Sequence, residues 1–357
     1  SIYEYISEDY PIDKYEYIYP DITINKNLVS NNTFGNLDLE TNYQIRKYET
    51  NKFTNFLIND LNWNHKILKN SIFNSKLLGN FKNINYEVKN VDIYKKDTTS
   101  ELFGAFGYLS ELNLIKDNNN GLHKLSPKVL LRYAPGEMRK EIENGYRLTP
   151  LSAFSIDRLD NEKNFETGLS GTIGFDYSIN KNNKDFDFSI AQIINNKENK
   201  KMHSKTSLDE KLSDIVGESS LKLNDQSKIS YDFSLDQNYS DINYSDFETQ
   251  FNFDPMKIGF NYILENKHIG DQEYFKGKLE YAKGKNGQLA FETKRNLVTN
   301  SAEFYNLSYE YFNDCLRAGL VYRREFYKDS ELEPENSLMF KVTLVPFGNI
   351  NSPSFGE

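Results

Sequence analysis

The dominant pattern along this chain is a two-residue alternation of apolar and polar side chains, interrupted at regular intervals by polar turns. A strand sends alternate side chains to opposite faces of a sheet, so this pattern predicts antiparallel strands that are apolar on one face only. The clearest alternating runs lie in the last third of the sequence, at Ile229–Leu235, Phe275–Tyr281, Tyr305–Tyr311, Leu316–Tyr322 and Leu338–Leu344.

The connections between these strands alternate between short and long. Counting back from the C-terminus, short turns are predicted at 313–314, 284–287, 254–255 and 224–227, and longer loops at 329–336, 298–300, 265–272, 237–241 and 195–214. Bacterial outer-membrane barrels have short periplasmic turns and long extracellular loops. The alternation therefore favours that class of protein, with the C-terminus in the periplasm.

Further strands are predicted upstream, for a total of roughly 16 to 18. One segment disrupts the alternation, because 134–150 is long where a short turn is required. Either Leu151 to Arg158 does not span the sheet, or the segment folds back into the lumen. The upstream candidates are 15–26, 34–48, 53–63, 72–88, 102–115, 125–133, 169–177 and 186–190.

Composition supports a membrane barrel more than a soluble sandwich. Only 38% of the 357 residues are hydrophobic, yet 25 Tyr and 25 Phe accompany a single Trp. Strong local alternation with low average apolarity is typical of a barrel with a polar interior. The predicted fold is an all-β, antiparallel transmembrane β-barrel of outer-membrane type, with 1–357 as a single domain. The net charge of −9 argues against a nucleic-acid partner.

Sequence motifs for catalysis or metal binding are missing. His65, His123, His203 and His268 are scattered, and Gly168 to Gly171 does not complete a nucleophile elbow. We therefore expect no enzyme activity, no cofactor and no metal. Three alternatives to a transport barrel stay open: a diffusion porin, an outer-membrane enzyme of phospholipase type, and a soluble multi-sheet binding protein.

Four segments resemble one protein family. They are SPKVLLRYAPGEMR from Ser126, NFETGLSGTIGFDY from Asn164, YNLSYEYFNDCLRAGLVYRREFY from Tyr305 and DSELEPENSLMFKVTLVPFG from Asp329. They are similar to the LPS-assembly outer-membrane protein LptD family, the lipopolysaccharide exporters. The resemblance is close from Ser126 onward and loose before it.

The resemblance implies a function and partners. Lipopolysaccharide would enter the outer leaflet of a Gram-negative outer membrane, its sugar part through the polar lumen and its lipid part through a lateral gate between the terminal strands. The family has a plug lipoprotein, LptE, and a periplasmic jelly-roll domain that binds the bridge protein LptA. Because the chain starts at Ser1 without Met, we expect it to be an internal or C-terminal piece of a precursor. By the resemblance and by its length, it would be the C-terminal part of the barrel, without the jelly roll and the first barrel strands.

The resemblance also assigns site residues. Cys315 would form a disulfide with a cysteine outside this chain, although the family has an adjacent C-terminal pair; the alternative is a small buried side chain. The last strand would form the gate, and Pro346 either weakens that seam or simply ends the strand. Its residues are Leu338, Phe340, Val342, Leu344 and Pro346.

Arg317 and Arg323 share the face opposite Leu316 and Leu320. If the leucine face meets lipid, both guanidinium groups enter the lumen. There they would contact lipopolysaccharide phosphates or pair with neighbouring carboxylates.

Overall fold

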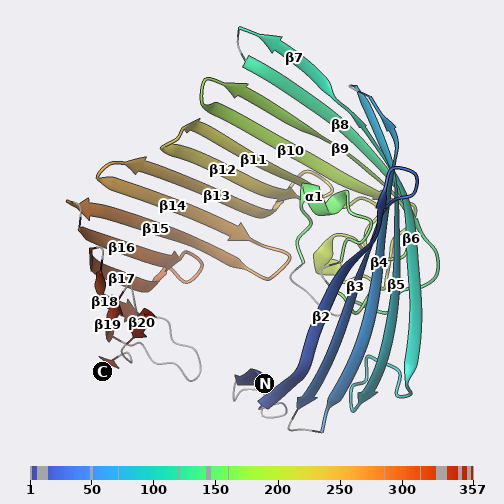
Figure 1. Ribbon diagram of the computed structural model, residues 1–357, viewed down its shortest axis with the longest axis horizontal. Coiled ribbons are helices and arrows are strands. Elements are labelled where there is room, and N and C mark those ends of the chain that lie inside the picture. Colours follow the sequence, from blue (N-terminus) through green and yellow to red (C-terminus); the bar gives the residue numbers. More distant parts are fainter. Residues whose placement is uncertain are drawn as a thin grey trace. The chain divides into compact units, whose positions relative to one another are not determined.

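The computed structural model is built almost entirely of antiparallel β-strands (Figure 1). It describes residues 2–5, 15–48, 51–70, 72–119, 121–141, 146–159, 161–284, 286–313, 315–326, 336–344, 348–351 and 355–356. No helix in these ranges is both long enough and apolar enough to cross a membrane. Seventeen described strands have nine residues or more, which agrees with the predicted number. The all-β, antiparallel prediction is confirmed.

Residue contacts divide the chain into two compact units. The first unit comprises 1–116, 124–177 and 189–216, and the second comprises 117–123, 178–188 and 217–357. That 1–357 forms one barrel domain stays a prediction.

The strands up to β10 contribute mainly to the first unit. They are β1 (Ile2–Tyr5), β2 (Tyr15–Asn31), β3 (Gly35–Tyr48), β4 (Phe53–Lys69), β5 (Phe73–Lys89), β6 (Thr99–Leu112), β7 (Leu114–Asn118), β8 (Gly121–Ala134), β9 (Gly168–Lys181) and β10 (Lys184–Asn195). Two short helices lie in the connections, α1 (Pro150–Ala153) and the 3-10 helix η1 (Ser204–Thr206).

The remaining strands belong to the second unit almost throughout. They are β11 (Ile215–Asn224), β12 (Ser227–Leu235), β13 (Ile242–Phe253), β14 (Met256–Glu265), β15 (Gln272–Lys283), β16 (Gly287–Asn296), β17 (Ser301–Phe312), β18 (Leu316–Glu325), β19 (Asn336–Leu344), β20 (Gly348–Asn351) and β21 (Phe355–Gly356).

The alternation of short and long connections is confirmed. Short connections occur at 182–183, 225–226, 254–255, 284–286 and 313–315, and longer ones at 196–214, 236–241, 266–271, 297–300 and 326–335. Leu151 to Arg158 is not a strand, which confirms the first of the two alternatives for that region. The connection from β8 to β9 therefore runs over 135–167. It stands where the alternation requires a long connection.

Apolar side chains form continuous cross-strand rows on one face of β15 to β19. The first row is Leu279, Phe291, Leu307, Tyr322 and Leu338, each paired with the next across a strand boundary. A second row beside it is Tyr281, Leu289, Tyr309, Leu320 and Phe340. All ten side chains are exposed, between 38% and 51%. The described part of the chain leaves these ten side chains exposed, which is the arrangement of a sheet that meets lipid.

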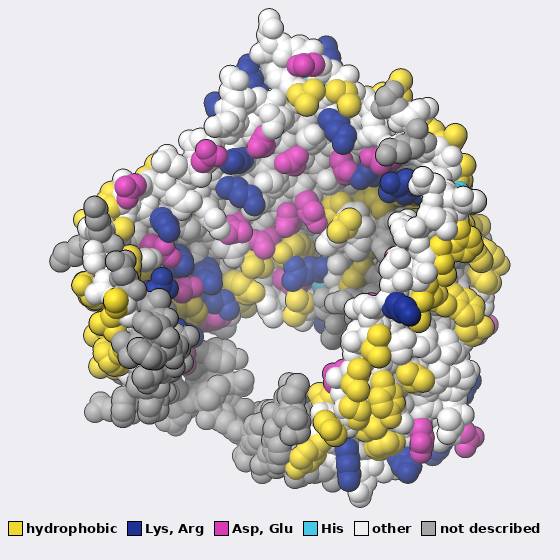
Figure 2. All heavy atoms as spheres, in the orientation of Figure 1, with side chains coloured by type: hydrophobic (Ala, Val, Ile, Leu, Met, Phe, Trp, Pro, Cys, Tyr) yellow, Lys and Arg dark blue, Asp and Glu magenta, His cyan; other side chains and the backbone are white. Residues whose placement is uncertain are grey.

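The opposite face of the same strands is polar. Lys278, Glu292, Asn306 and Arg323 form a row across β15 to β18. In the space-filling view, Lys and Arg side chains are interspersed with Asp and Glu over the second unit (Figure 2). The one-residue offset between the apolar and polar rows follows directly from the pleat of the strands.

The first unit has the same two-faced pattern, with one difference. Large apolar side chains on one face of the sheet are exposed, among them Leu57, Phe81, Leu102, Phe106 and Leu131. Its other face is partly apolar too, but there the side chains are buried because 135–167 and the β5–β6 connection lie over them. The first unit thus has a conventional core on one face and an uncovered apolar surface on the other.

The outermost long strands carry short strands on their second edges. β1 pairs with β2 at one end of the chain, and β20 and β21 pair with β19 at the other. An unpaired edge strand offers its backbone groups to other chains, so these short strands cover part of each edge.

The exposed rows lead to a first prediction. We expect Leu289→Arg, on the apolar face, to lower the free energy of unfolding in lipid vesicles by about 2–4 kcal/mol if it lies near the bilayer centre. Ala290→Arg is the matched control, because Ala290 pairs with Glu280 on the polar face. Chemical unfolding of both variants in vesicles measures the difference, and equal losses would contradict the assignment of faces.

Candidate functional site

The 135–167 segment packs on the buried face of the first unit and closes over a hydrophobic core. Phe165 is fully buried among side chains from β4, β5, β6 and β8, and Ile156 packs against the same cluster. A Cβ atom on Gly107 of β6 would come within 2.8 Å of the Ile156 Cδ1 atom. Because Gly107 has no side chain, the Ile156 side chain can occupy this space. The sheet residues of the cluster are Phe56, Ile58, Ile84, Tyr86, Val88, Phe103, Ala105 and Ala134.

Two arginines and one glutamate form a buried charge network beneath the segment. Arg158 donates from Nε and Nη2 to the two carboxylate oxygens of Glu166, both at 2.7 Å, and from Nη2 to Ser170 Oγ at 2.9 Å. Arg132 of β8 donates to the backbone oxygens of Ile156 and Glu166, both at 2.7 Å. The three charged side chains are at most 3% exposed. Such forked, desolvated contacts fix the backbone of the segment on the sheet.

A second buried pair lies at the turn that follows α1. Lys82 Nζ of β5 is 2.5 Å from Asp157 Oδ2 and 3.4 Å from Asp60 Oδ2 of β4. Burial raises the pKa of Asp157, and the Lys82 ammonium group opposes that shift. This contact ties the middle of the segment to two neighbouring strands.

The start of the segment is held by Arg139. Its Nη1 atom is 2.6 Å from Glu101 Oε2 on β6, and its guanidinium carbon lies 5.2 Å and 4.9 Å from the ring centres of Tyr86 and Tyr94. Glu101 also accepts a 3.2 Å hydrogen bond from the Tyr86 hydroxyl. Charge-assisted and cation–π contacts thus act on one side chain together.

The 196–214 connection packs against the same segment through a second hydrophobic cluster. Met138 and Leu148 of the segment meet Met202 and Leu208 of the connection. The Glu141 amide donates to the Lys201 backbone oxygen at 2.7 Å. Burial also raises the pKa of Tyr146, which packs on this cluster, to about 12. The two long connections form one covered layer on the first unit.

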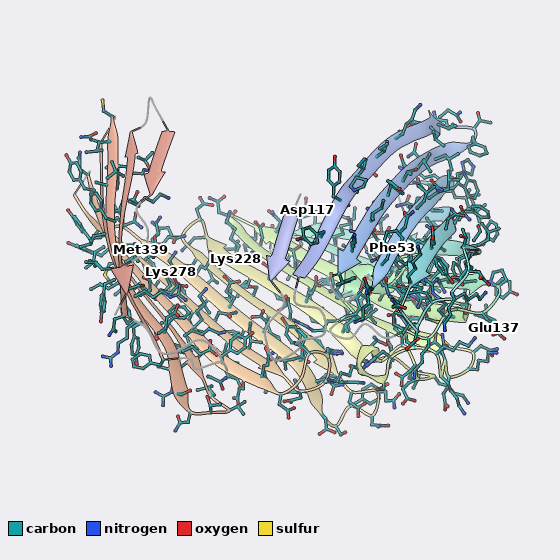
Figure 3. The ribbon with its side chains drawn as sticks, turned by 90° about the horizontal axis from the view of Figure 1, so that it is seen from below. Phe53, Asp117, Glu137, Lys228, Lys278 and Met339 are labelled. Carbon is teal, nitrogen blue, oxygen red and sulfur yellow. The ribbon has the colours of Figure 1, made fainter. Side chains whose placement is uncertain are left out.

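On the polar face of the second unit, charges are paired but remain accessible. Lys278 Nζ is 2.6 Å from Glu280 Oε1, and Lys276 Nζ is 2.9 Å from Glu292 Oε1. Both lysine side chains are about half exposed. Lys278 is labelled on β15 in Figure 3. Exposed ion pairs of this kind contribute only about 0–1 kcal/mol each, so an anionic ligand can replace the carboxylate.

Arg317 and Arg323 lie on this polar face, and each has a carboxylate neighbour. Arg317 Nε is 3.4 Å from Glu310 Oε1, and Arg323 Nε is 2.5 Å from Glu325 Oε1. Arg323 also lies over the Phe304 ring at 4.6 Å. Their contact with lipopolysaccharide stays a prediction.

Cys315 lies in the short turn between β17 and β18. Its thiol is exposed and free within the described chain, so the structure does not place it as a small buried side chain. Asn313 Oδ1 accepts hydrogen bonds from the Cys315 and Leu316 amides, at 3.0 Å and 2.8 Å, and so fixes the turn. The disulfide with a cysteine outside the chain stays a prediction.

The predicted gate residues lie on the apolar face of β19. Leu338 and Phe340 are 47% and 51% exposed, and Val342 and Leu344 continue the same face. Pro346 lies outside the described residues. β19 pairs with β18 over nine residues, but with β20 over four and β21 over two. Among the described residues, its second edge therefore has six backbone pairs against nine on the β18 side.

The buried network was not predicted from the sequence. Asp157 and Arg158 are adjacent, but Lys82, Arg132 and Glu166 are distant from one another in the sequence, and no local motif joins them. The one available signal was the break in the alternation at 134–150, which marked a segment without a place in the sheet. In the described ranges, no group of three or more His, Cys, Asp or Glu side chains is arranged to hold a metal ion.

Comparison with known proteins decides the family. A model of the LptD family, described as LPS transport system D, matches residues 17–304, well over half of the sequence. The chain belongs to the LptD family. The match includes the segments from Ser126 and Asn164 and so confirms their resemblance, whereas the segments from Tyr305 and Asp329 lie beyond the matched residues and their resemblance stays a prediction. Membership in the LptD family supports lipopolysaccharide transport by an outer-membrane β-barrel, because members of the family are components of a transport system.

Other comparisons are distant. Two mutant porins from Rhodopseudomonas blastica are 9% identical to the chain with a TM-score of 0.30. The matches cover 80% and 96% of this chain, and 98% and 100% of the porins. At that TM-score the likeness has no bearing on function. No curated protein matches the sequence.

The buried network leads to a second prediction. We expect Glu166→Gln to leave Arg158 and Arg132 buried without their carboxylate, which costs about 3–5 kcal/mol. The loss would appear as faster hydrogen exchange in 146–159, with β12 to β18 unchanged.

Glu137→Gln is the matched control in the same segment, because the Glu137 side chain is 85% exposed and pairs only with Lys201 in the described contacts. Unchanged exchange in the Glu166 variant would mean that the charge network does not hold the segment.

Proposed function

We propose that this chain forms the membrane-embedded part of a conduit that inserts lipopolysaccharide into the outer leaflet of a Gram-negative outer membrane. The observation that carries the proposal is the pair of opposed surfaces on β15 to β19, one apolar and uncovered, the other lined with accessible charge pairs. Family membership supports the substrate. Transport is not catalysis, and its energy comes from outside this chain.

The sugar part of lipopolysaccharide would pass along the polar face of the second unit. Its phosphates are anions that can compete with Glu280, Glu292 and Glu310 for the lysines and arginines beside them. Because each exposed pair is weak, exchange of partners is cheap and the substrate is not trapped. The buried network of the first unit cannot act this way, because its charges are already desolvated and bound.

The lipid part would leave sideways at β19. Opening a seam requires breaking its backbone pairs, and the described edge of β19 away from β18 has six of them, against nine on the β18 side. Leu338 and Phe340 extend the apolar face up to that edge, so acyl chains would meet apolar side chains as they leave. In this proposal β20 and β21 separate from β19 when the seam opens.

The orientation and partners complete the proposal. Short connections face the periplasm and long ones the outside, as in other outer-membrane barrels. The plug lipoprotein LptE would occupy the lumen, and LptA would deliver lipopolysaccharide through a periplasmic domain. Cys315 would then lie on the periplasmic side, where a disulfide can form.

Photocrosslinking from adjacent positions tests this proposal and is the third prediction. We expect a photoreactive side chain at Lys278 to capture lipopolysaccharide only while transport is energised. Leu279 is the matched control, since it is the next residue and points to the opposite face. Crosslinks at Leu279 should not depend on energy. Energy-dependent capture confined to the apolar face would contradict the proposed path.

The fourth prediction concerns the turn thiol. The intact protein isolated from cells should migrate differently on gels with and without reductant, and Cys315→Ser should abolish that difference. Cys315 is the only cysteine in this chain, so any remaining shift in the variant would involve other cysteines. If the mobility of the wild-type protein does not change with reductant, the predicted disulfide is wrong.

A further inference from the structure

A basic hollow lies at one end of the first unit. Its walls include Asn51 and Lys52, just before β4, and Asn90, Asp92 and Lys96 of the connection from β5 to β6, and its volume is about 700 Å³. Four of its lining residues are lysines, Lys47, Lys52, Lys89 and Lys96, against one acidic residue, Asp92. This concentration of positive charge stands out in a chain with a net charge of −9.

The floor of the hollow is a cross-strand row with an aromatic ring at its centre. Lys47 of β3 is opposite Phe53 of β4, and Phe53 is opposite Lys89 of β5. Residues directly opposite one another share a face of the sheet, so a lysine lies on either side of one aromatic residue. Phe53 is labelled at the start of β4 in Figure 3, and the Lys89 Nζ atom lies 5.7 Å from its ring centre.

This row belongs to the uncovered apolar face of the first unit. Leu57 is four residues further along β4 and faces the same way, about 13 Å from Phe53 along the strand. Leu57 and Phe81 are 38% and 46% exposed on that face. Apolar surface that ends in an aromatic ring and lysines is the pattern of a membrane interface, where lipid head groups lie.

The walls of the hollow are fixed by two asparagines. Asn51 and Asn90 both adopt left-handed backbone conformations, with φ of 60° and 57°. The Asn90 Nδ2 atom donates to the Asn51 backbone oxygen at 2.9 Å, which joins the two connections. The lysines are thus placed around a formed hollow.

The lysines of the row form only weak ion pairs within the described chain. Lys89 Nζ is 3.8 Å from Glu87 Oε1, and both side chains are largely exposed, at 66% and 45%. Such a pair contributes about 0–1 kcal/mol at most. Lys47 is exposed beside Phe53. A ligand with two negative charges would therefore meet little competition.

We propose that this hollow binds the phosphate groups of a phosphorylated glycolipid in the surrounding leaflet, with its acyl chains along the apolar face below. The glycolipid and a free phosphate ion both present a phosphoryl group to the lysines. Continuity with the exposed apolar face favours the lipid, because a soluble ion gains nothing from Phe53 and Leu57. The assignment to the outer leaflet rests on the orientation in the proposed function, which puts these two connections outside the cell.

Equilibrium binding tests the proposal and is the fifth prediction. The probe is a diphosphorylated disaccharide glycolipid, added to the purified full chain in detergent and counted by native mass spectrometry. We expect Lys47→Gln/Lys89→Gln to weaken binding by about tenfold to thirtyfold, since a basic residue near a lipid surface contributes on the order of 1 kcal/mol. Lys181→Gln/Lys184→Gln is the matched control, with the same charge change around the 182–183 turn.

Three results would overturn the proposal. One is equal binding of the dephosphorylated glycolipid, and another is an equal loss in both double variants, which would reflect net charge alone. The third is displacement of the glycolipid by millimolar inorganic phosphate, which would identify a site for a free anion. Failure of energy-dependent crosslinking at Lys278 would refute the transport path without affecting this binding result, so the two proposals can fail separately.

Discussion

The structure depends on one constraint: in hydrocarbon, backbone groups must be hydrogen-bonded within the protein and side chains that face lipid must be apolar. A pleated antiparallel sheet meets both demands, because it satisfies its own backbone and sends alternate side chains to opposite faces. Across β15 to β19, two rows of five apolar side chains remain exposed while charges gather on the other face. The polar surface needed for transport is a consequence of the same pleat.

Charge is used in two ways in this molecule, and burial separates them. Arg158 and Glu166 are almost completely buried, so breaking their contact would leave an unpaired ion away from water. Because that costs free energy, the contact holds the 135–167 segment in place. Lys276 and Lys278 pair with carboxylates in the open, where the same contact is weak and easily exchanged. The conduit proposed above would need both a rigid wall and a surface that releases the anionic glycolipid it binds.

The sequence predicted the strands well because their signal is local. Phe275, Tyr305 and Leu338 each lie in a run with a period of two, and most predicted strands overlap the observed ones, with ends that differ by a few residues. The same logic placed Arg317 and Arg323 opposite Leu316 and Leu320. Leu151 to Arg158 marked the limit of this approach, because an apolar run without a partner strand can pack on a face instead of joining the sheet.

The buried network could not be predicted for a different reason. Lys82 and Asp157 are 75 positions apart, and their contact depends on how the 135–167 segment folds over β5. Periodicity reports which face a side chain takes, not which distant segment will cover it. The space for Ile156 over Gly107 likewise follows from tertiary packing, since an isolated glycine in a strand has several explanations.

The most direct measurement of which face meets lipid uses spin labels at single cysteines along β15. On a Cys315→Ser background, labels at Lys278, Leu279, Glu280 and Tyr281 would be tested in bilayers for collision with oxygen and with a water-soluble nickel chelate. The alternation predicts oxygen access at Leu279 and Tyr281 and nickel access at Lys278 and Glu280. Labels at Leu279 and Tyr281 that reach neither reagent, as in a dry protein core, would contradict the lipid-facing assignment.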